Sequence, residues 1–359
     1  MSRLALILFC FWSVLQLPAQ ARPAASSLLD EGRPTESSVY LKPVETIEVR
    51  SEPGTVFADP LKCDRDGNLF FQPNVFPHEE IHSLNAKGQP LASFRPRAIP
   101  ELSLDGIGAY AIGPRGELYQ IVFPHEIARS VAVFTADGKY KSAIKLKLRF
   151  EFTPGPLGVF PSGDILVSGL RWRGKDVARE PFTGIFSPDG TLVKEVKFED
   201  DQELREMAAR GDSRVTSPEN PTGNRAVSFS QMETGDDGNV YLMRWTNPAI
   251  FYAISPTGEV SRRFTVDPGE PGLRPMEMHI SGNRIAVVFS DFEQEETVED
   301  SRLAVVDLEG REIATYRGLQ STSKTKLHMS QFACYSADPE RFTFFAEDKN
   351  LQLVVAQPR

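Results

Sequence analysis

The chain consists of short apolar stretches separated by turns, and this pattern repeats along most of its length. From about residue 44 onward, each apolar stretch is followed by a turn that contains glycine. Glycine reaches the positive φ that tight hairpin turns require, and the Asp, Asn or Pro beside it favours the same turns. Apart from residues 201–210, no long segment has the apolar spacing of a helix. The pattern predicts an all-β protein.

Ten glycine turns form two sets that alternate along the chain. The first set includes DRDGNLFF and GPRGELYQ, and the second includes TADGKYKS and SPDGTLVK. Turns of the first set lie about 44 to 49 residues apart, with one longer interval, and this spacing is typical of a four-stranded propeller blade. Such blades bury their faces by stacking around an axis. The glycines are Gly67, Gly88, Gly116, Gly138, Gly163, Gly190, Gly238, Gly258, Gly282 and Gly310.

The last repeat is incomplete, because Gln331–Arg359 provides only three strands. The alternating segment Val44–Ser51 supplies a fourth strand if it pairs with this last blade. That pairing closes the ring and removes an exposed sheet edge. The sequence therefore predicts a six-bladed β-propeller over residues 44–359, closed by its N-terminal strand.

One part of the second repeat resembles a known class of propeller. GPRGELYQIV followed by VAVFTADGKYKSAIKL is similar to the NHL-type six-bladed propellers, in which a turn glycine, a Leu-Tyr strand and a Phe-turn-Gly hairpin recur. The resemblance extends from about Val44 to the C-terminus and implies the architecture. Enzymes, binding proteins and scaffolds all share this architecture, so it implies no single function.

The longer interval contains an insertion at about residues 199–228, between blades three and four. Its segment DQELREMAAR is rich in helix formers and ends at Gly211, which is typical of a helix C-terminus. We expect one short helix and a polar loop, which either cover one mouth of the ring or decorate its surface.

The N-terminal segment has the features of a secretory signal peptide. Arg3 precedes an apolar run, and the small residues Ala19 and Ala21 fit a cleavage site after residue 21. An uncleaved anchor, or lipidation at Cys10, is the alternative. Residues 22–43 predict a flexible linker. We therefore expect a secreted or periplasmic protein with no stable membrane span after cleavage.

Composition and charge narrow the classes of function. The 359 residues carry a net charge of −9, which argues against nucleic-acid binding. No P-loop, GxSxG, HExxH or CxxC motif is present, so no catalytic residue is nominated. We expect a monomer without a cofactor.

After signal cleavage two cysteines remain, Cys63 and Cys334. Cys63 lies four residues before Gly67, and Cys334 lies four residues before Asp338 at the matching turn of blade six. Both positions fall on innermost strands of neighbouring blades. A disulfide between them and a pair of buried thiols both remain open.

The tetrapeptide FPHE occurs twice, at residues 76–79 and 123–126. Both copies fall in loops between second and third strands, which meet on the face opposite the glycine turns. Trp and Arg suit a small polar ligand with a flat or apolar face, and a protein partner is also possible on such a surface. We expect one mouth of the ring to present His78, His125, Arg171, Trp172, Arg244 and Trp245.

The sequence thus favours a binding module, and an enzyme at the same mouth is the alternative. Certain NHL-type lyases gather histidines around zinc, and His78, His125 and His328 could form such a set. A calcium-dependent lactone hydrolase is the other metal-dependent possibility, but FADPLKCD stands where its first-blade glutamate motif is expected.

Overall fold

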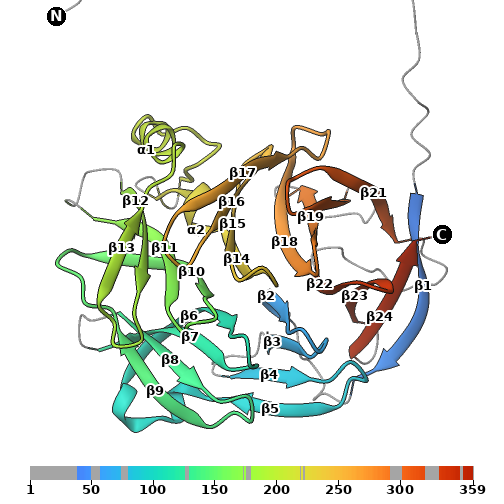
Figure 1. Cartoon of the computed structure of the whole chain (residues 1–359), viewed down its shortest axis with the longest axis horizontal. Helices are drawn as coiled ribbons and strands as arrows, with labels where there is room; N and C mark the ends of the chain where they lie inside the picture. Colours follow the sequence, from blue (N-terminus) through green and yellow to red (C-terminus); the bar gives the residue numbers. More distant parts are fainter. Residues whose placement is uncertain are drawn as a thin grey trace, which may run out of the picture. The chain divides into compact units, whose positions relative to one another are not determined.

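The computed structural model describes residues 39–49, 57–73, 80–125, 129–172, 174, 179–218, 220, 223–291, 301–319, 331–347 and 351–358. In this part of the chain, six blades of four strands follow one another around a central axis (Figure 1). The protein is a six-bladed β-propeller, so the predicted fold is confirmed.

In blades one to five the strands run from the axis outward in chain order. Blade one contains β2 (Phe57–Cys63), β3 (Leu69–Pro73), β4 (Ile81–Leu84) and β5 (Pro90–Phe94). The short helices η1 (Pro96–Ala98) and η2 (Pro100–Leu102) lead to blade two, with β6 (Leu104–Ile112), β7 (Leu118–Pro124), β8 (Ser130–Phe134) and β9 (Tyr140–Lys145). Blade three contains β10 (Phe152–Val159), β11 (Ile165–Arg171), β12 (Glu180–Phe186) and β13 (Leu192–Val196).

The second half of the ring follows the same plan. Blade four contains β14 (Gln231–Thr234), β15 (Val240–Arg244), β16 (Ala249–Ile254) and β17 (Val260–Val266). Blade five contains β18 (Leu273–Ser281), β19 (Arg284–Asp291), β20 (Arg302–Asp307) and β21 (Glu312–Leu319). Blade six contains β22 (Phe332–Ala337), β23 (Glu340–Glu347), β24 (Leu351–Pro358) and the N-terminal strand β1 (Val39–Glu48).

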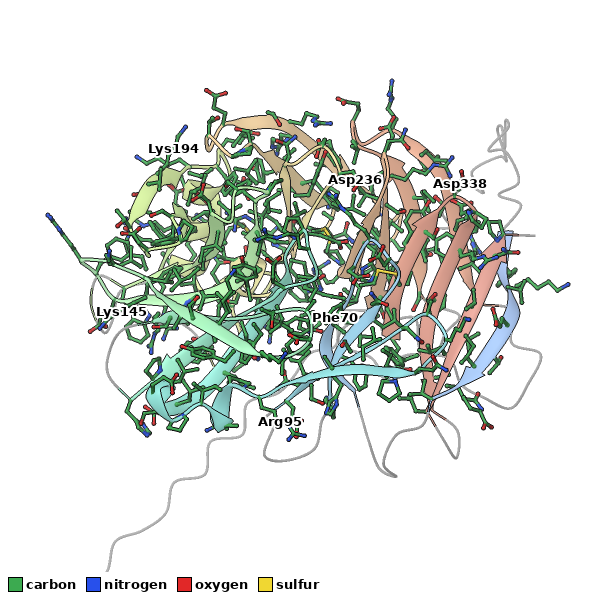
Figure 2. All side chains as sticks on the ribbon, turned by 60° about the horizontal axis from the view of Figure 1, so that its bottom comes forward. Phe70, Arg95, Lys145, Lys194, Asp236 and Asp338 are labelled. Carbon is green, nitrogen blue, oxygen red and sulfur yellow. A yellow bond between two sulfur atoms is a disulfide. The ribbon has the colours of Figure 1, made fainter. Side chains whose placement is uncertain are left out.

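The glycine turns lie together on one face of the ring, which we call the turn face. All ten predicted turn glycines have positive φ, between 58° and 90°. At Gly67, for example, the backbone N–H donates to the Asp64 carbonyl and closes the β2–β3 hairpin. The opposite face, which we call the loop face, carries the connections between second and third strands. Figure 2 shows Asp236 and Asp338 at the turn face and Arg95 at the other edge.

The N-terminal strand closes the ring as predicted. β1 pairs antiparallel with β24, from Leu41 opposite Pro358 to Glu48 opposite Gln352. β1 begins at Val39, before the Val44 at which the sequence predicts it. Its first residues also pair in parallel with β21, so blades five and six form one eight-stranded sheet.

A disulfide joins the two ends of the ring near the axis. Cys63 in β2 and Cys334 in β22 are bonded, with their Cα atoms 5.4 Å apart (Figure 2, yellow bond). The bond lies between the innermost strands of blades one and six. It therefore holds the same junction that β1 closes from the outside.

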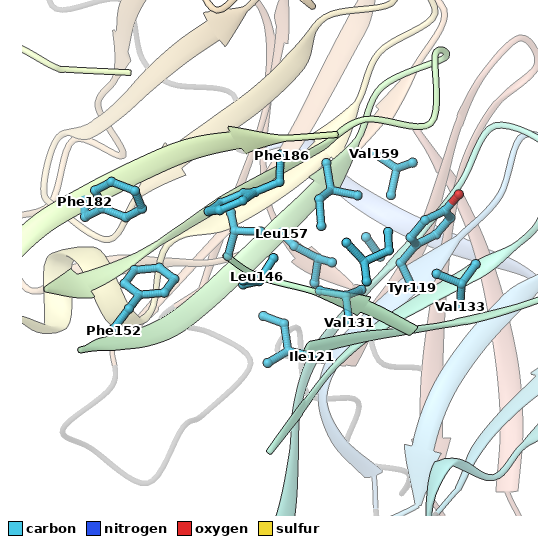
Figure 3. Packing of buried hydrophobic residues seen from close by; sticks show 14 residues of the cluster. Tyr119, Ile121, Val131, Val133, Leu146, Phe152, Leu157, Val159, Phe182 and Phe186 are labelled. Carbon is cyan, nitrogen blue, oxygen red and sulfur yellow. The ribbon is translucent and has the colours of Figure 1, made fainter. Parts of the chain in front are cut away.

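Apolar side chains fill the space between neighbouring blades. Between blades two and three, Ile121 and Val131 pack with Leu157, Val159 and Phe186 in one buried cluster (Figure 3). Complete burial of one such side chain stabilises the fold by roughly 1.5–3 kcal/mol. Because each blade needs a neighbour on both faces, the ring depends on its closure.

The insertion between blades three and four forms the two α-helices of the fold's described part. α1 (Asp201–Ala209) ends before Gly211, whose φ is 68°, so the predicted helix is confirmed. α2 (Arg225–Ser228) follows a loop and leads directly into blade four. Leu204 and Met207 of α1 pack with Val227 of α2 against Leu170 of β11. Among the described residues, no helix has the length and apolar character needed to cross a membrane.

Deleting residues 1–51 should lower the melting temperature and broaden the unfolding transition, because blade six loses its outer strand and β21 loses its parallel partner. Deletion of residues 1–37 is the matched control, since it leaves β1 whole. Differential scanning calorimetry of both proteins checks the result. Equal melting of the two proteins contradicts the role of β1 in closure.

Replacing both cysteines (Cys63→Ser/Cys334→Ser) should lower the free energy of unfolding by roughly 5 kcal/mol, because the bond closes a very long loop. The two residues are 271 positions apart in the sequence. Guanidinium chloride unfolding measures the loss, and wild-type protein under reducing conditions should match the variant. Thiol titration of unfolded, non-reduced protein that starts at residue 22 should find none, and two thiols per chain would refute the bond.

Candidate functional site

Two cavities lie along the axis of the ring, one at each face. The turn-face chamber has a volume of about 650 Å³ and is lined by the ends of the inner strands and their glycine turns. The loop-face chamber has a volume of about 530 Å³ and is lined by the beginnings of the inner strands and by the end of the insertion. Lys62 and Met232 line both chambers, so they lie at the level where the two meet.

A hydrogen bond crosses the axis at the level where the two chambers meet. The Lys62 Nζ donates to the Met232 carbonyl at 3.1 Å, and the lysine is only 8% exposed. Lys62 belongs to β2 of blade one and Met232 to β14 of blade four, which lie on opposite sides of a six-membered ring. Figure 1 shows β2 close to the middle of the ring, beside β14 and β22. The axis is therefore bridged at mid-height.

The backbone of β2 bulges where it approaches the axis. Its pairing with β3 shifts register between Ala58 and Lys62. The Tyr110 hydroxyl of blade two lies 2.6 Å from the Pro60 carbonyl oxygen and 2.9 Å from that of Phe70, and so holds the bulge in place. Tyr110 is 1% exposed. A buried phenol of the neighbouring blade thus helps to set the position of Lys62.

The turn-face chamber carries charges of both signs. Arg65 and Asp236 form an ion pair at 2.9 Å that again joins blades one and four, and both side chains are about half exposed. Deeper in the chamber, Glu233 accepts a hydrogen bond from the Ile280 backbone N–H at 3.1 Å. Opposite charges on one wall favour a polar or zwitterionic occupant over an apolar one.

Glu233 also faces a buried histidine of blade five. The His279 Nε2 donates to the Phe332 carbonyl at 3.1 Å, because a carbonyl can only accept. Its Nδ1 lies 3.6 Å from Glu233 Oε2, and His279 is 1% exposed. The contact links blades four, five and six beside the chamber.

The loop-face chamber is largely apolar and has an aromatic pair at its rim. Phe229, which directly follows α2, is 45% exposed, whereas Trp245 is 6% exposed. Their rings meet edge to face with centroids 5.3 Å apart. The Trp245 backbone N–H donates to the Ala226 carbonyl, which fixes the loop after β15 against α2. Tyr110, Pro156, Leu157, Met232 and Met276 complete the apolar wall.

The five predicted mouth residues that the structure describes do not form one cluster. His125 is exposed beside β7, where its Nδ1 contacts an Asp105 carboxylate oxygen. Arg171 lies at the end of β11 and forms ion pairs with Glu180 at 3.3 Å and Glu195 at 3.7 Å. Neither residue lines a chamber. His78 lies outside the described residues.

The two tryptophans have different environments. The Trp172 Nε1 donates to the Thr153 hydroxyl at 3.0 Å, and the Arg179 guanidinium stacks on its ring at 3.7 Å. Trp172 lies outside both chambers. Trp245, in contrast, lines the loop-face chamber, so one of the five predicted residues that the structure describes reaches the axial cavity at the predicted face.

The expectation that Arg244 opens onto the loop face is wrong. Its side chain is 0% exposed, and its Nη2 donates to Asp201 at 2.7 Å while Nε lies 3.6 Å from Asp200. Burial raises the pKa of the Asp201 carboxyl above its usual value, and Arg244 acts in the opposite direction. Asp200 and Asp201 at the start of α1 form ion pairs with Arg244, so this arginine connects blade four to the insertion.

The histidine set suggested for zinc is only partly described. His125 belongs to the described residues, whereas His78 and His328 do not. Within the described ranges, no three His, Cys, Asp or Glu side chains come close enough together to hold a metal ion. The metal-dependent alternative therefore stays a hypothesis.

Sequence reasoning missed Lys62, Glu233 and Phe229. A signal for the first two was present, because aligning the blades on their turn glycines puts one axial position five residues before each glycine. Lys62, Ala111, Gly158 and Glu233 occupy this position in blades one to four, and all four line the turn-face chamber. Phe229 follows an irregular insertion, for which no repeat register exists.

Replacing Arg244 by methionine should destabilise the protein by about 3–5 kcal/mol, because the buried Asp200 carboxylate and the partly buried Asp201 carboxylate lose their cation. Arg65→Met is the matched control, since it breaks an exposed ion pair and should cost less than about 1 kcal/mol. Denaturant unfolding of both variants compares the losses. Similar small losses in both variants would show that Arg244 does not support the insertion.

Comparisons with known proteins add no function. No protein family and no curated protein matches the sequence. The chain is similar in structure to a protein of unknown function from Bacteroides caccae (13% identity, TM-score 0.44, covering 74% of this chain and 82% of that one). It is also similar to the WD40 domain of Neurospora crassa Pan2 (13%, 0.45, covering 90% and 97%) and to a putative TolB from Agrobacterium tumefaciens (11%, 0.46, covering 90% and 99%). At these identities and scores the similarities carry no argument about activity.

Proposed function

We propose that this protein is an exported binding module that holds one small ligand in the loop-face chamber and performs no catalysis of its own. The observation that carries the proposal is the chamber itself, with about 530 Å³ of space, apolar walls and polar groups at few points. Small-molecule sites in proteins have this composition. The signal-peptide features of residues 1–21 support export.

The rim of the chamber supports the same function. Phe229 is the exposed member of the aromatic pair, and an exposed phenyl ring beside a cavity gains burial when a ligand covers it. The Trp245 backbone is bonded to α2, and its ring already packs edge to face on Phe229 beside the chamber. A preformed aromatic wall lowers the entropy lost on binding.

The insertion has a defined part in this site. Ser228, Phe229 and Ser230 line the chamber, and they are positioned by α2, which packs on β11 through the apolar cluster of the insertion. Of the two roles expected for residues 199–228, this geometry favours the wall of a mouth over surface decoration.

A thermal-shift screen of small organic metabolites tests the proposed function. At least one compound should raise the melting temperature of the wild-type protein, and Phe229→Ala should weaken its binding about fivefold to tenfold because one aromatic contact is lost. Ile313→Ala is the matched control, since both side chains are 45% exposed and Ile313 lies on β21, outside the chambers. The proposal fails if every stabilising compound acts equally on the two variants.

A further inference from the structure

The loop-face chamber has one charged group at its floor. Of the described residues that line it, Lys62 alone carries a formal charge, and the others are apolar or neutral polar. The lysine is buried, at 8% exposure, and its ammonium donates one hydrogen bond, to the Met232 carbonyl. An ammonium has three N–H donors, so two remain for another acceptor.

A buried cation against a backbone carbonyl is an incomplete arrangement. Removing a charge from water is costly unless an opposite charge or several hydrogen bonds compensate it. The carbonyl supplies only a partial negative charge. An anionic group that entered the chamber and contacted Lys62 would supply a full negative charge.

We infer that the ligand of the loop-face chamber is an amphipathic organic anion with a single negative charge. This inference rests on the proposed function and names its ligand class. The anionic group contacts the Lys62 ammonium at the floor, and an apolar or aromatic body fills the space up to Phe229 and Trp245 at the rim. A second negative charge would find no cation in the described wall and would be buried without compensation.

Because the protein carries a net negative charge, only close contacts in the chamber can favour an anionic ligand. A protein with a net charge of −9 repels anions at long range, so general electrostatic attraction does not favour such a ligand. The turn-face chamber offers carboxylates as well as cations, including Glu233 and Asp236. The loop-face side of Lys62 is thus the better place for an anion.

Two fluorescent probes that differ by one charged group test the inference. 8-Anilinonaphthalene-1-sulfonate is an aromatic monoanion, and N-phenyl-1-naphthylamine is the same ring system without the sulfonate. The wild-type protein should bind the anion more tightly than the neutral probe. Lys62→Met should weaken binding of the anion about tenfold or more and leave binding of the neutral probe within about twofold, because a charge-assisted hydrogen bond is lost and the apolar wall is kept.

Arg65→Met is the control, because it removes the same charge from the turn-face chamber. It should leave the binding of both probes within about twofold of wild type. Retained binding of the neutral probe by Lys62→Met shows that this variant is folded. If that variant does not fold, the wild-type comparison decides, and equal or tighter binding of the neutral probe overturns the inference.

The outcomes separate the inference from the proposed function. If both probes bind, Phe229→Ala weakens both, and Lys62→Met changes neither, the chamber binds ligands but the anionic ligand class is wrong. If Arg65→Met weakens the anion as much as Lys62→Met does, the sulfonate is not held at the floor of the loop-face chamber and the inference is overturned. If neither probe depends on Phe229, the inference fails, while the metabolite screen still decides the proposed function.

Discussion

Closure of the ring is the constraint on which this structure depends. A four-stranded blade has two apolar faces and cannot bury either of them alone, so each of the six blades is stable only between two neighbours. Among the described blades, blade six is assembled from both ends of the chain, because its outer strand β1 is N-terminal and its other three strands are C-terminal. Two interactions hold the ring closed. The strands β1 and β24 pair on the outside, and the disulfide joins Cys63 and Cys334 on the inside.

The same constraint explains how much could be predicted from the sequence. The glycines of the hairpins recur with the blade, so the number of blades, the face of each loop and the level of Cys63 and Cys334 all follow from one register. The site does not repeat. Arg244 looks like a mouth residue in the register, but an insertion that breaks the repeat brings Asp200 and Asp201 onto it. Contacts made by irregular segments depend on tertiary packing, which local pattern does not specify.

The hydrogen bond between Lys62 and Met232 spans the central axis of the ring. Lys62 and Met232 meet between two chambers, and a bulge in β2 held by Tyr110 brings the lysine there. In this protein the described residues form one chamber toward each face, and Lys62 and Met232 line both of them.

The pairing of β1 also sets how the fold responds to mechanical load. Leu41, near the start of β1, pairs with Pro358, near the end of β24, so a pull that separates the two chain ends opens this ladder one pair at a time. Val39 and Leu41 also pair in parallel with β21, so this second pairing must break before β1 is released. Once β1, β24, β23 and the parts of β2 and β22 outside the two cysteines have been pulled out, the disulfide carries the force from Cys63 directly to Cys334. The blades between these two residues are then bypassed, and extension stops at the covalent clasp.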